Sequence, residues 1–383
     1  MLQETVFKSL HEAAGARMVD FAGWFMPVQY NSIVEEHKLV RSACGLFDVS
    51  HMGRIIITGK QHKEFVEHIC SNTRANMKPG RVRYNLICKE DGTILDDVLV
   101  SASLEDGAPS EKDVKANPPL ALRKGCTMIV CNAGNHPKIA AWIDKQSKNF
   151  DVHIHDISAA YPMLALQGPR SQDILQPLTD ADLGSLKYYT CTVGTVLGVK
   201  DVIISRTGYT GEDGFELIFP KAVAEKVFKG LVEKGKAGGL ALTGLGARDS
   251  LRLEAGMPLY GHEIDETINP LEAGLDWAVD LKKNFIGSDA LKKIAKAGIK
   301  RTLVGLDVQD KRIARQGMKV MHKGKAVGAI ASGTKSPTLD KIIATAHVPV
   351  EVAKNAGTVD VELREGVLAA AKVVPTTFYT RKK

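Results

Sequence analysis

Predicted strands and helices are interleaved in the pattern of apolar and polar positions up to about residue 295. Residues 55–58 are β-branched and strand-like. Residues 82–87 and 94–100 flank Asp91-Gly92, and an Asp-Gly pair between two apolar runs predicts a β-hairpin. Apolar positions at helical spacing predict helices at 63–70, 137–143, 222–233 and 246–254.

The character of the chain changes near residue 300. From Leu303 onward, strand-like runs separated by turns dominate, which predicts a separate β domain of about 85 residues. Earlier in the chain, residues 104–119 are polar, contain three prolines and lack periodicity. This segment is predicted to be a surface insertion between strands.

Composition limits the class of protein. The chain has 383 residues, enough for two or three domains at about 150 residues each, and its 44% hydrophobic and 25% charged residues are typical of globular proteins. The net charge of +7 is spread along the chain, which favours an anionic ligand or an acidic partner over nucleic acid. No apolar run approaches the roughly 18 residues of a membrane helix, and the N-terminus lacks the apolar core of a secretory signal.

Cysteine and histidine spacing gives no metal site. None of the six cysteines forms a Cys-x-x-Cys pair, a pattern typical of a reduced intracellular protein. His153 and His155 share one face of a predicted strand, but no cysteine or carboxylate stands at ligand spacing. We interpret this pair as part of a solvated strand.

Two adjacent carboxylates, Asp96 and Asp97, interrupt the otherwise apolar strand at 94–100. Strand neighbours point to opposite faces, so we expect that the two cannot share one environment. Because an unpaired buried charge is costly, at least one should face a cavity, a ligand or a helix N-terminus. The alternative, that one pairs locally and the other lies at an exposed strand end, is equally compatible with composition.

Glu216 is the single charge in a predicted strand where Phe215, Leu217 and Phe219 share a face. It follows a glycine-rich segment, 206–214, that is neither a Walker A motif nor a dinucleotide fingerprint. A glutamate here could accept two parallel donors from the amidine edge of a ligand. An ordinary turn followed by a strand-edge glutamate is the simpler interpretation.

Arg248 and Arg252 share one face of a predicted helix at i, i+4 spacing. Surface charge, with an i, i+3 pair between Asp249 and Arg252, is the simpler interpretation of this helix. The spacing alone is therefore weak evidence for a binding site.

Seven motifs, taken together and in order, resemble the T-protein family of the glycine cleavage system, the tetrahydrofolate-dependent aminomethyltransferases. They span nearly the whole chain and lie at 21–24, 47–52, 94–97, 166–169, 208–214, 247–254 and 332–338.

The resemblance implies an α+β fold of three domains around a central cavity: two interleaved α+β domains and a C-terminal β-barrel-like domain. The expected domains are 1–48 with 158–258, 49–157 with 259–297, and 298–383. The last boundary agrees with the change of character near residue 300.

The resemblance also implies the reaction. A member of this family takes the aminomethyl group from the lipoyl arm of H-protein, releases ammonia and forms 5,10-methylenetetrahydrofolate. Lipoylated H-protein and folate are the implied partners, and tetrahydrofolate is the co-substrate. Asp97, the second aspartate of the Ile-Leu-Asp-Asp motif, matches the family's catalytic residue.

The remaining implied site residues bind folate. Glu216 matches the glutamate that grips the pterin ring, and Arg248 is next in that site. Residues that fall where the family contacts folate are Tyr84, Met52, Asn132 and, in the last domain, Arg315. Phe378 stands where some members carry a tyrosine, so a polar contact there is not expected.

Two related families are alternatives. The non-enzymatic folate-binding iron–sulfur assembly factors carry a cysteine-containing signature, but no cysteine follows Cys191 here. The oxidising sarcosine and dimethylglycine dehydrogenases need a fused flavin domain, and this chain lacks a dinucleotide fingerprint. The insertion at 104–119 and the basic balance favour a mitochondrial matrix protein, whereas a bacterial source would imply the cytosol.

Overall fold

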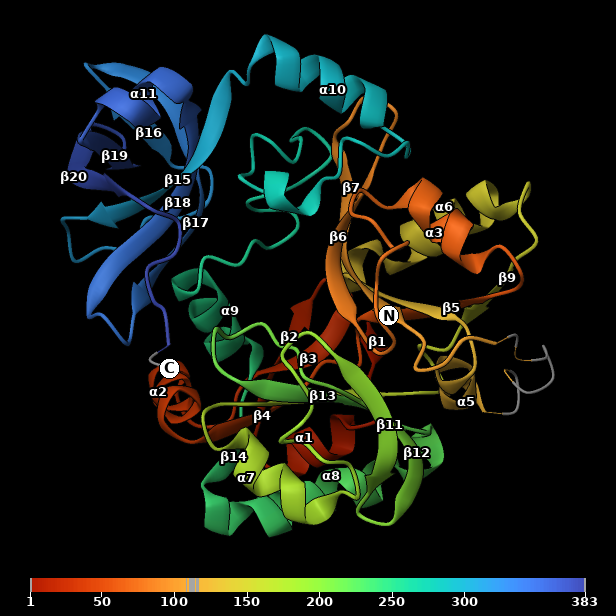
Figure 1. Ribbon diagram of the computed structural model, residues 1–383. Helices are drawn as coiled ribbons and strands as arrows, with labels where there is room; N and C mark the ends of the chain where they lie inside the picture. Colours follow the sequence, from red (N-terminus) through yellow and green to blue (C-terminus); the bar gives the residue numbers. More distant parts are fainter. Residues whose placement is uncertain (1, 108, 110–113, 115–116, 382–383) are drawn as a thin grey trace. The chain divides into compact units, whose positions relative to one another are not determined.

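The computed structural model describes residues 2–107, 109, 114 and 117–381 (Figure 1). The chain forms two compact units, Met1–Asn85 with Asp96–Arg248, and Leu86–Leu95 with Asp249–Lys383. The three domain boundaries expected from the resemblance remain a prediction. The predicted insertion at 104–119 lies partly outside the described residues.

A six-stranded sheet is the centre of the first unit, with the order β11-β12-β13-β10-β4-β14. Its strands are β4 (Cys44–Asp48), β10 (Met163–Gln167), β11 (Cys191–Val196), β12 (Val199–Ser205), β13 (Gly214–Ile218) and β14 (Leu240–Leu242). Strands β13, β10 and β4 are buried at every residue, so both of their faces are covered.

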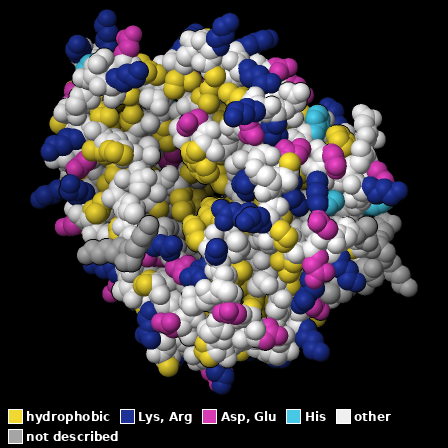
Figure 2. All heavy atoms as spheres, in the orientation of Figure 1, with side chains coloured by type: hydrophobic (Ala, Val, Ile, Leu, Met, Phe, Trp, Pro, Cys, Tyr) yellow, Lys and Arg dark blue, Asp and Glu magenta, His cyan; other side chains and the backbone are white. Residues whose placement is uncertain are grey.

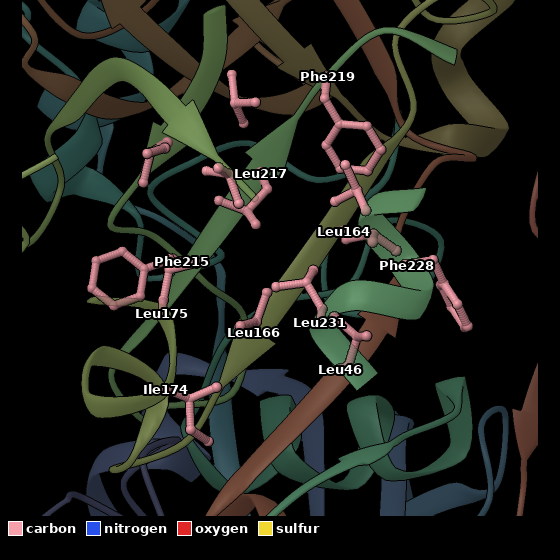
Figure 3. Close-up of a cluster of buried hydrophobic side chains, with 14 of the residues drawn as sticks. Leu46, Leu164, Leu166, Ile174, Leu175, Phe215, Leu217, Phe219, Phe228 and Leu231 are labelled. Atoms are coloured by element: carbon pink, nitrogen blue, oxygen red, sulfur yellow. The ribbon is translucent and has the colours of Figure 1, made fainter. Parts of the chain in front are cut away.

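The core of this unit lies on one face of the six-stranded sheet, where α7 (Ser171–Leu175) and α8 (Ala224–Gly235) pack (Figure 1). Side chains of β10 and β13 gather there with Phe228 and Leu231 of α8 (Figure 3). Phe215 and Leu217 belong to this core. Glu216, between them, therefore points to the opposite face, as the alternation predicted.

A five-stranded sheet has the order β6-β7-β8-β5-β9. Its strands are β5 (Gly53–Thr58), β6 (Val82–Cys88), β7 (Ile94–Ala102), β8 (Thr127–Cys131) and β9 (His153–Asp156). The neighbouring strands β6 and β7 confirm the predicted hairpin, whose Gly92 has a φ of +84°. Helices α3 (His62–Ile69) and α6 (His136–Ser147) lie side by side beside this sheet (Figure 1).

The remaining elements of the first unit are short. A three-stranded sheet has the order β1-β3-β2, from Gln3–Glu4, Trp24–Gln29 and Arg17–Phe21. The helices are α1 (Lys8–Ala13), α2 (Ile33–Ser42), α5 (Pro118–Arg123) and the 3-10 turns η1 (Ala133–Asn135), η2 (Gln176–Leu178), η3 (Lys221–Val223) and η4 (Lys236–Gly238). Ser32 caps α2 by accepting a hydrogen bond from the Glu35 amide at 3.2 Å.

The second unit contains a closed six-stranded barrel in the order β15-β18-β17-β16-β19-β20, which confirms the predicted C-terminal β domain. Its strands are β15 (Arg301–Val308), β16 (Lys319–His322), β17 (Lys325–Ser336), β18 (Lys341–Pro349), β19 (Thr358–Arg364) and β20 (Val367–Val374). The turn η5 (Asp276–Ala278) and helices α10 (Ser288–Ala297) and α11 (Val350–Asn355) belong to the same unit, and α9 (Leu245–Glu254) crosses the boundary.

Charged side chains of both signs are interspersed on the face shown in Figure 2, as expected from the spread of the charge along the sequence. Within the described part of the chain, no helix combines the length and the apolar character that crossing a membrane requires.

Gly168, directly after β10, is expected to tolerate no side chain. Its φ is +139°, and a Cβ would lie 2.2 Å from the carbonyl oxygen of Ala43. Gly168→Ala should therefore lower the thermal unfolding midpoint, because a strained backbone costs about 1–3 kcal/mol and the clash with fixed backbone adds to this cost. Gly15→Ala is the matched control: its φ is +75°, with nothing within 4 Å of a Cβ. Equal midpoints for the two variants would contradict the predicted clash at Gly168.

Candidate active site

A pair of carboxylates lies near the start of strand β7. Asp96 is fully buried and Asp97 is half-buried. The Tyr84 hydroxyl on β6 donates a hydrogen bond to Asp97 Oδ2 at 2.9 Å. The side-chain amide of Asn132 donates to Asp97 Oδ1 at 2.6 Å. Neutral donors thus hold both oxygens of a carboxylate that retains some exposure.

Asp96 and Asp97 share an environment, so the expectation that they cannot was wrong. The amide nitrogen of Asn132 that donates to Asp97 also lies 2.9 Å from Asp96 Oδ1. The strand register explains why. Strands β7 and β8 pair Leu99 with Val130, and two more residues along this antiparallel ladder place Asn132 opposite Asp97. Asn132 follows the last residue of β8, so its side chain can reach both carboxylates.

Burial and charge raise the pKa of one of the two carboxyl groups, that of Asp96. Burial, together with the charge of Asp97, raises the pKa of Asp96 to about 7, although hydrogen bonds from Asn135 and Asn132 oppose the shift. Burial and the neighbouring Asp97 also raise the pKa of Tyr84 well above its ordinary value, so the tyrosine keeps its proton and remains a donor.

The second cluster is centred on Glu216 of β13. Its carboxylate is buried and accepts a hydrogen bond from the Thr207 hydroxyl. Burial raises the pKa of Glu216, while the Thr207 hydrogen bond and the positive charge of Arg248 lower it. Glu216 is thus a buried acceptor facing a cation, rather than a strand-edge charge exposed to solvent.

Arg248 of α9 is only partly satisfied. Its guanidinium carbon lies 4.7 Å from the centre of the Tyr209 ring, and its Nη2 lies 3.9 Å from Met52 Sδ. Its Nη1 is buried and meets no acceptor among the described residues. A buried donor without an acceptor costs about 1–3 kcal/mol, which a ligand acceptor could recover.

Two tyrosines connect the clusters. Burial is the main cause of the raised pKa of Tyr189, and the charges of Glu216 and Asp97 both contribute to it. Tyr209 packs under Arg248 and contributes to the raised pKa of Tyr84. The structure therefore brings six predicted site residues into one region of the first unit: Asp97, Glu216, Arg248, Tyr84, Met52 and Asn132.

Sequence reasoning missed three residues of this region. Tyr189 has a φ of +59°, which no sequence pattern signals. Tyr209 lies in the glycine-rich segment that drew attention only for its glycines. His51 is buried beside Met52, its Nδ1 meets no partner in the described parts of the chain, and burial lowers its pKa to about 4, so the ring is neutral at pH 7.

Arg252 differs from Arg248 although the two share a helix face. Arg252 pairs with Glu263 at 2.7 Å and with Asp249 at 2.9 Å, so for this residue the simpler, structural interpretation holds. The neighbouring Glu254 carboxylate accepts a hydrogen bond from the Thr338 hydroxyl at 2.8 Å. These contacts anchor the barrel loop, the segment between β17 and β18, to the end of α9 within the second unit.

Arg315 and the C-terminal segment also belong to the second unit. Arg315 is exposed, and its role in the site remains a prediction. The amides of Phe378 and Tyr379 both donate to the Glu254 carbonyl oxygen, at 2.9 and 2.7 Å. The same glutamate therefore holds the barrel loop and the C-terminal segment.

The first unit thus combines a half-buried carboxylate with a recognition pair. Asp97 can stabilise a positive charge that forms beside it. Glu216 accepts and Arg248 donates, which suits a ligand edge with both kinds of group. Across the described residues, no group of three or more His, Cys, Asp or Glu side chains could hold a metal ion.

Comparisons with known proteins identify the family of the chain. The GCVT N-terminal domain family matches residues 7–107 and 120–283, and the glycine cleavage T-protein C-terminal barrel domain matches 301–380. Aminomethyltransferase of Moorella thermoacetica is 46% identical over 383 residues, covering 100% of this chain and 99% of the relative. That of Acidobacterium capsulatum is 43% identical, covering 100% of this chain and 97% of the relative.

A solved structure agrees as well. The glycine cleavage system aminomethyltransferase T of Bartonella henselae has a TM-score of 0.87 and 32% identity, covering 99% of this chain and 98% of that chain. The expected α+β fold with a C-terminal barrel is confirmed, and nothing favours the iron–sulfur assembly alternative. These relatives are bacterial, so they give no support to the expected mitochondrial location.

Two family models covering most of the sequence and full-length relatives above 40% identity give one answer: the chain belongs to the T-protein family of the glycine cleavage system, the aminomethyltransferases.

Proposed function

We propose that this aminomethyltransferase takes the aminomethyl group from the lipoyl arm of H-protein and passes its carbon to tetrahydrofolate. The observation that carries the proposal is the half-buried Asp97 carboxylate, held by Tyr84 and Asn132 in the same unit as the Glu216–Arg248 pair. A charge-stabilising group and a recognition group in one region suit a transfer between two substrates.

Folate recognition rests on the second cluster. Glu216 would accept hydrogen bonds from the amidine edge of the pterin ring. The buried Nη1 of Arg248 needs an acceptor, and a pterin offers oxygen and nitrogen acceptors. Met52, in contact with Arg248, would pack against the ligand.

The remaining predicted folate contacts have more limited roles. The side-chain amide nitrogen of Asn132 already donates to two carboxylates. Its side-chain carbonyl oxygen is therefore the part of the amide that is left to contact a ligand. Tyr84 would act mainly through the hydrogen bond that its hydroxyl donates to Asp97. The role of Arg315 is proposed from the resemblance alone.

Asp97 would act on the reacting group. As N5 of tetrahydrofolate bonds to the methylene carbon and the amino group leaves, positive charge develops on N5 and the methylene carbon, and a neighbouring carboxylate stabilises it. Ammonia leaves, the carbon–sulfur bond breaks, and N10 closes the five-membered ring of 5,10-methylenetetrahydrofolate. The two N–H protons lost by tetrahydrofolate are balanced by one gained by the lipoyl thiolate and one by ammonia.

The partner on the other side of the reaction is lipoylated H-protein. The excess charge of +7 suits an acidic carrier protein and the carboxylates of a folate polyglutamate tail. Long-range attraction of this kind speeds association more than it fixes geometry.

Asp97→Asn should abolish most transfer while folate binding survives. The variant keeps the shape of the side chain but removes the charge, so the transfer rate should fall by about 10²–10⁴-fold. A glycine-cleavage assay with aminomethyl-loaded H-protein measures the rate, and calorimetry measures the dissociation constant for tetrahydrofolate. Asp173→Asn, at an exposed position of α7, is the matched control. Near-normal turnover by Asp97→Asn would rule out this role.

Glu216→Ala should weaken tetrahydrofolate binding. Loss of a charged acceptor costs about 1.5–3 kcal/mol, so the dissociation constant should rise by about tenfold to a hundredfold. Calorimetry with tetrahydrofolate measures the change. Glu225→Ala, which removes an exposed glutamate paired with Lys229, is the control and should bind as the parent protein does. An unchanged constant for Glu216→Ala would refute the assignment of Glu216.

A further inference from the structure

We propose that Asp96 is a positioning residue for Asp97: through the shared amide of Asn132, it fixes the Asp97 carboxylate and shares its ionisation. Asp96 itself is fully buried, so it does not reach a substrate. The inference deepens the proposed function, because it rests on the role of Asp97 in transfer.

Asp96 accepts hydrogen bonds on both of its carboxylate oxygens. Its Oδ1 accepts from the side-chain amides of Asn132 at 2.9 Å and Asn135 at 2.7 Å. Its Oδ2 accepts from the backbone amide of Asn132 at 3.1 Å. Asp96 therefore holds both the backbone and the side chain of the residue that donates to Asp97.

The orientation of the Asn132 amide depends on both carboxylates. Its two hydrogens serve Asp96 Oδ1, Asp97 Oδ1 and, at 3.2 Å, the Asp97 carbonyl oxygen. An amide whose acceptors lie on both sides has one favourable rotamer and one favourable flip. Removing the Asp96 acceptors would release that amide and, with it, one of the groups that hold the Asp97 carboxylate.

Among the described residues, the titratable groups linked to Asp96 are Asp97 on the same strand and Cys131 on β8. Tyr84 on β6 acts on them through Asp97. Arg54 on β5 and Asp156 on β9 act on Cys131. Burial raises the pKa of the Cys131 thiol, so it stays neutral. No lysine or arginine within the described ranges forms an ion pair with Asp96, so its charge is not compensated by a cation.

Asp96 and Asp97 therefore titrate as a coupled pair. Burial and the charge of Asp97 raise the pKa of Asp96 to about 7. As the pH falls through that value, the buried Asp96 takes up a proton, which leaves the pair with one negative charge. That charge resides on the half-buried Asp97. A protonated Asp96, however, presents an O–H donor to the donors Asn132 and Asn135, as the amide of an Asp96→Asn variant presents an N–H donor, so protonation should also disturb the Asn132 amide.

Infrared spectroscopy of the protein alone tests the shared ionisation. As the pH is raised from 6 to 8, the C=O band of a protonated carboxyl group should disappear from the spectrum of the parent protein. Asp96→Asn should lack that band at both pH values. Glu216→Gln should keep it, which separates Asp96 from Glu216, a second buried carboxyl group whose pKa is raised by burial. A band that is absent from the parent protein, or that persists in Asp96→Asn, would overturn the proposal.

Kinetics test the positioning. In Asp96→Asn, the new side-chain amide presents a donor to the donors Asn132 and Asn135. The Asn132 amide should therefore turn away from Asp97, and kcat should fall by about tenfold to a hundredfold. The dissociation constant for tetrahydrofolate should stay within about twofold, because Asp96 makes no ligand contact. Asp144→Asn, at an exposed position of α6, is the matched control.

The two proposals fail separately. If the parent protein transfers no aminomethyl group but shows the band, the proposed function is wrong, while the coupled ionisation of Asp96 and Asp97 is supported. If Asp96→Asn folds normally and keeps the parental kcat, the positioning role of Asp96 is wrong even if Asp97 is essential.

Discussion

The side-chain amide of Asn132 links two adjacent carboxylates, Asp96 and Asp97, in strand β7. Without donors, a buried carboxylate costs several kcal/mol, and a second one beside it adds repulsion. Here one side chain donates to both, at 2.9 and 2.6 Å, and burial shifts the pKa of Asp96 to about 7. A proton on Asp96 thus relieves the repulsion within the pair, and the remaining negative charge lies on Asp97.

The second cluster, centred on Glu216 and Arg248, also contains buried charged groups. Glu216 and Arg248 act on each other electrostatically in a buried setting, but Arg248 keeps one buried donor that meets no acceptor among the described residues. An imperfectly satisfied cluster lowers the stability of the empty protein and gains when a complementary ligand binds. The cation–π contact with Tyr209 holds the guanidinium in place meanwhile.

Local patterns predicted the hairpin of β6 and β7, the β domain that begins at β15, and the outward direction of Glu216 from its hydrophobic core. The place of Asn132 could not be predicted, because it depends on the register between β7 and β8, which are separated by a long connection. The motif order nevertheless named the residue, and the register shows how its amide is used.

Tertiary contacts also give different roles to Arg248 and Arg252, which lie on the same face of α9. In the described part of the chain, Arg252 forms an ion pair with the buried Glu263 at 2.7 Å, whereas Arg248 forms none with the buried Glu216. Within the helix only the i, i+3 pair of Arg252 with Asp249 distinguishes them, and the buried partners Glu263 and Glu216 lie elsewhere in the chain. The positive φ of Tyr189 is equally invisible to periodicity, since it is imposed by the surrounding fold.

The proposed site couples ammonia release to carbon transfer onto folate. A single-turnover reaction with aminomethyl-loaded H-protein, run with and without tetrahydrofolate, tests this coupling most directly. Ammonia and 5,10-methylenetetrahydrofolate should form together, in equal amounts, at a rate that depends on tetrahydrofolate. Ammonia release at the same rate without tetrahydrofolate, or no methylenetetrahydrofolate in its presence, would contradict the coupling.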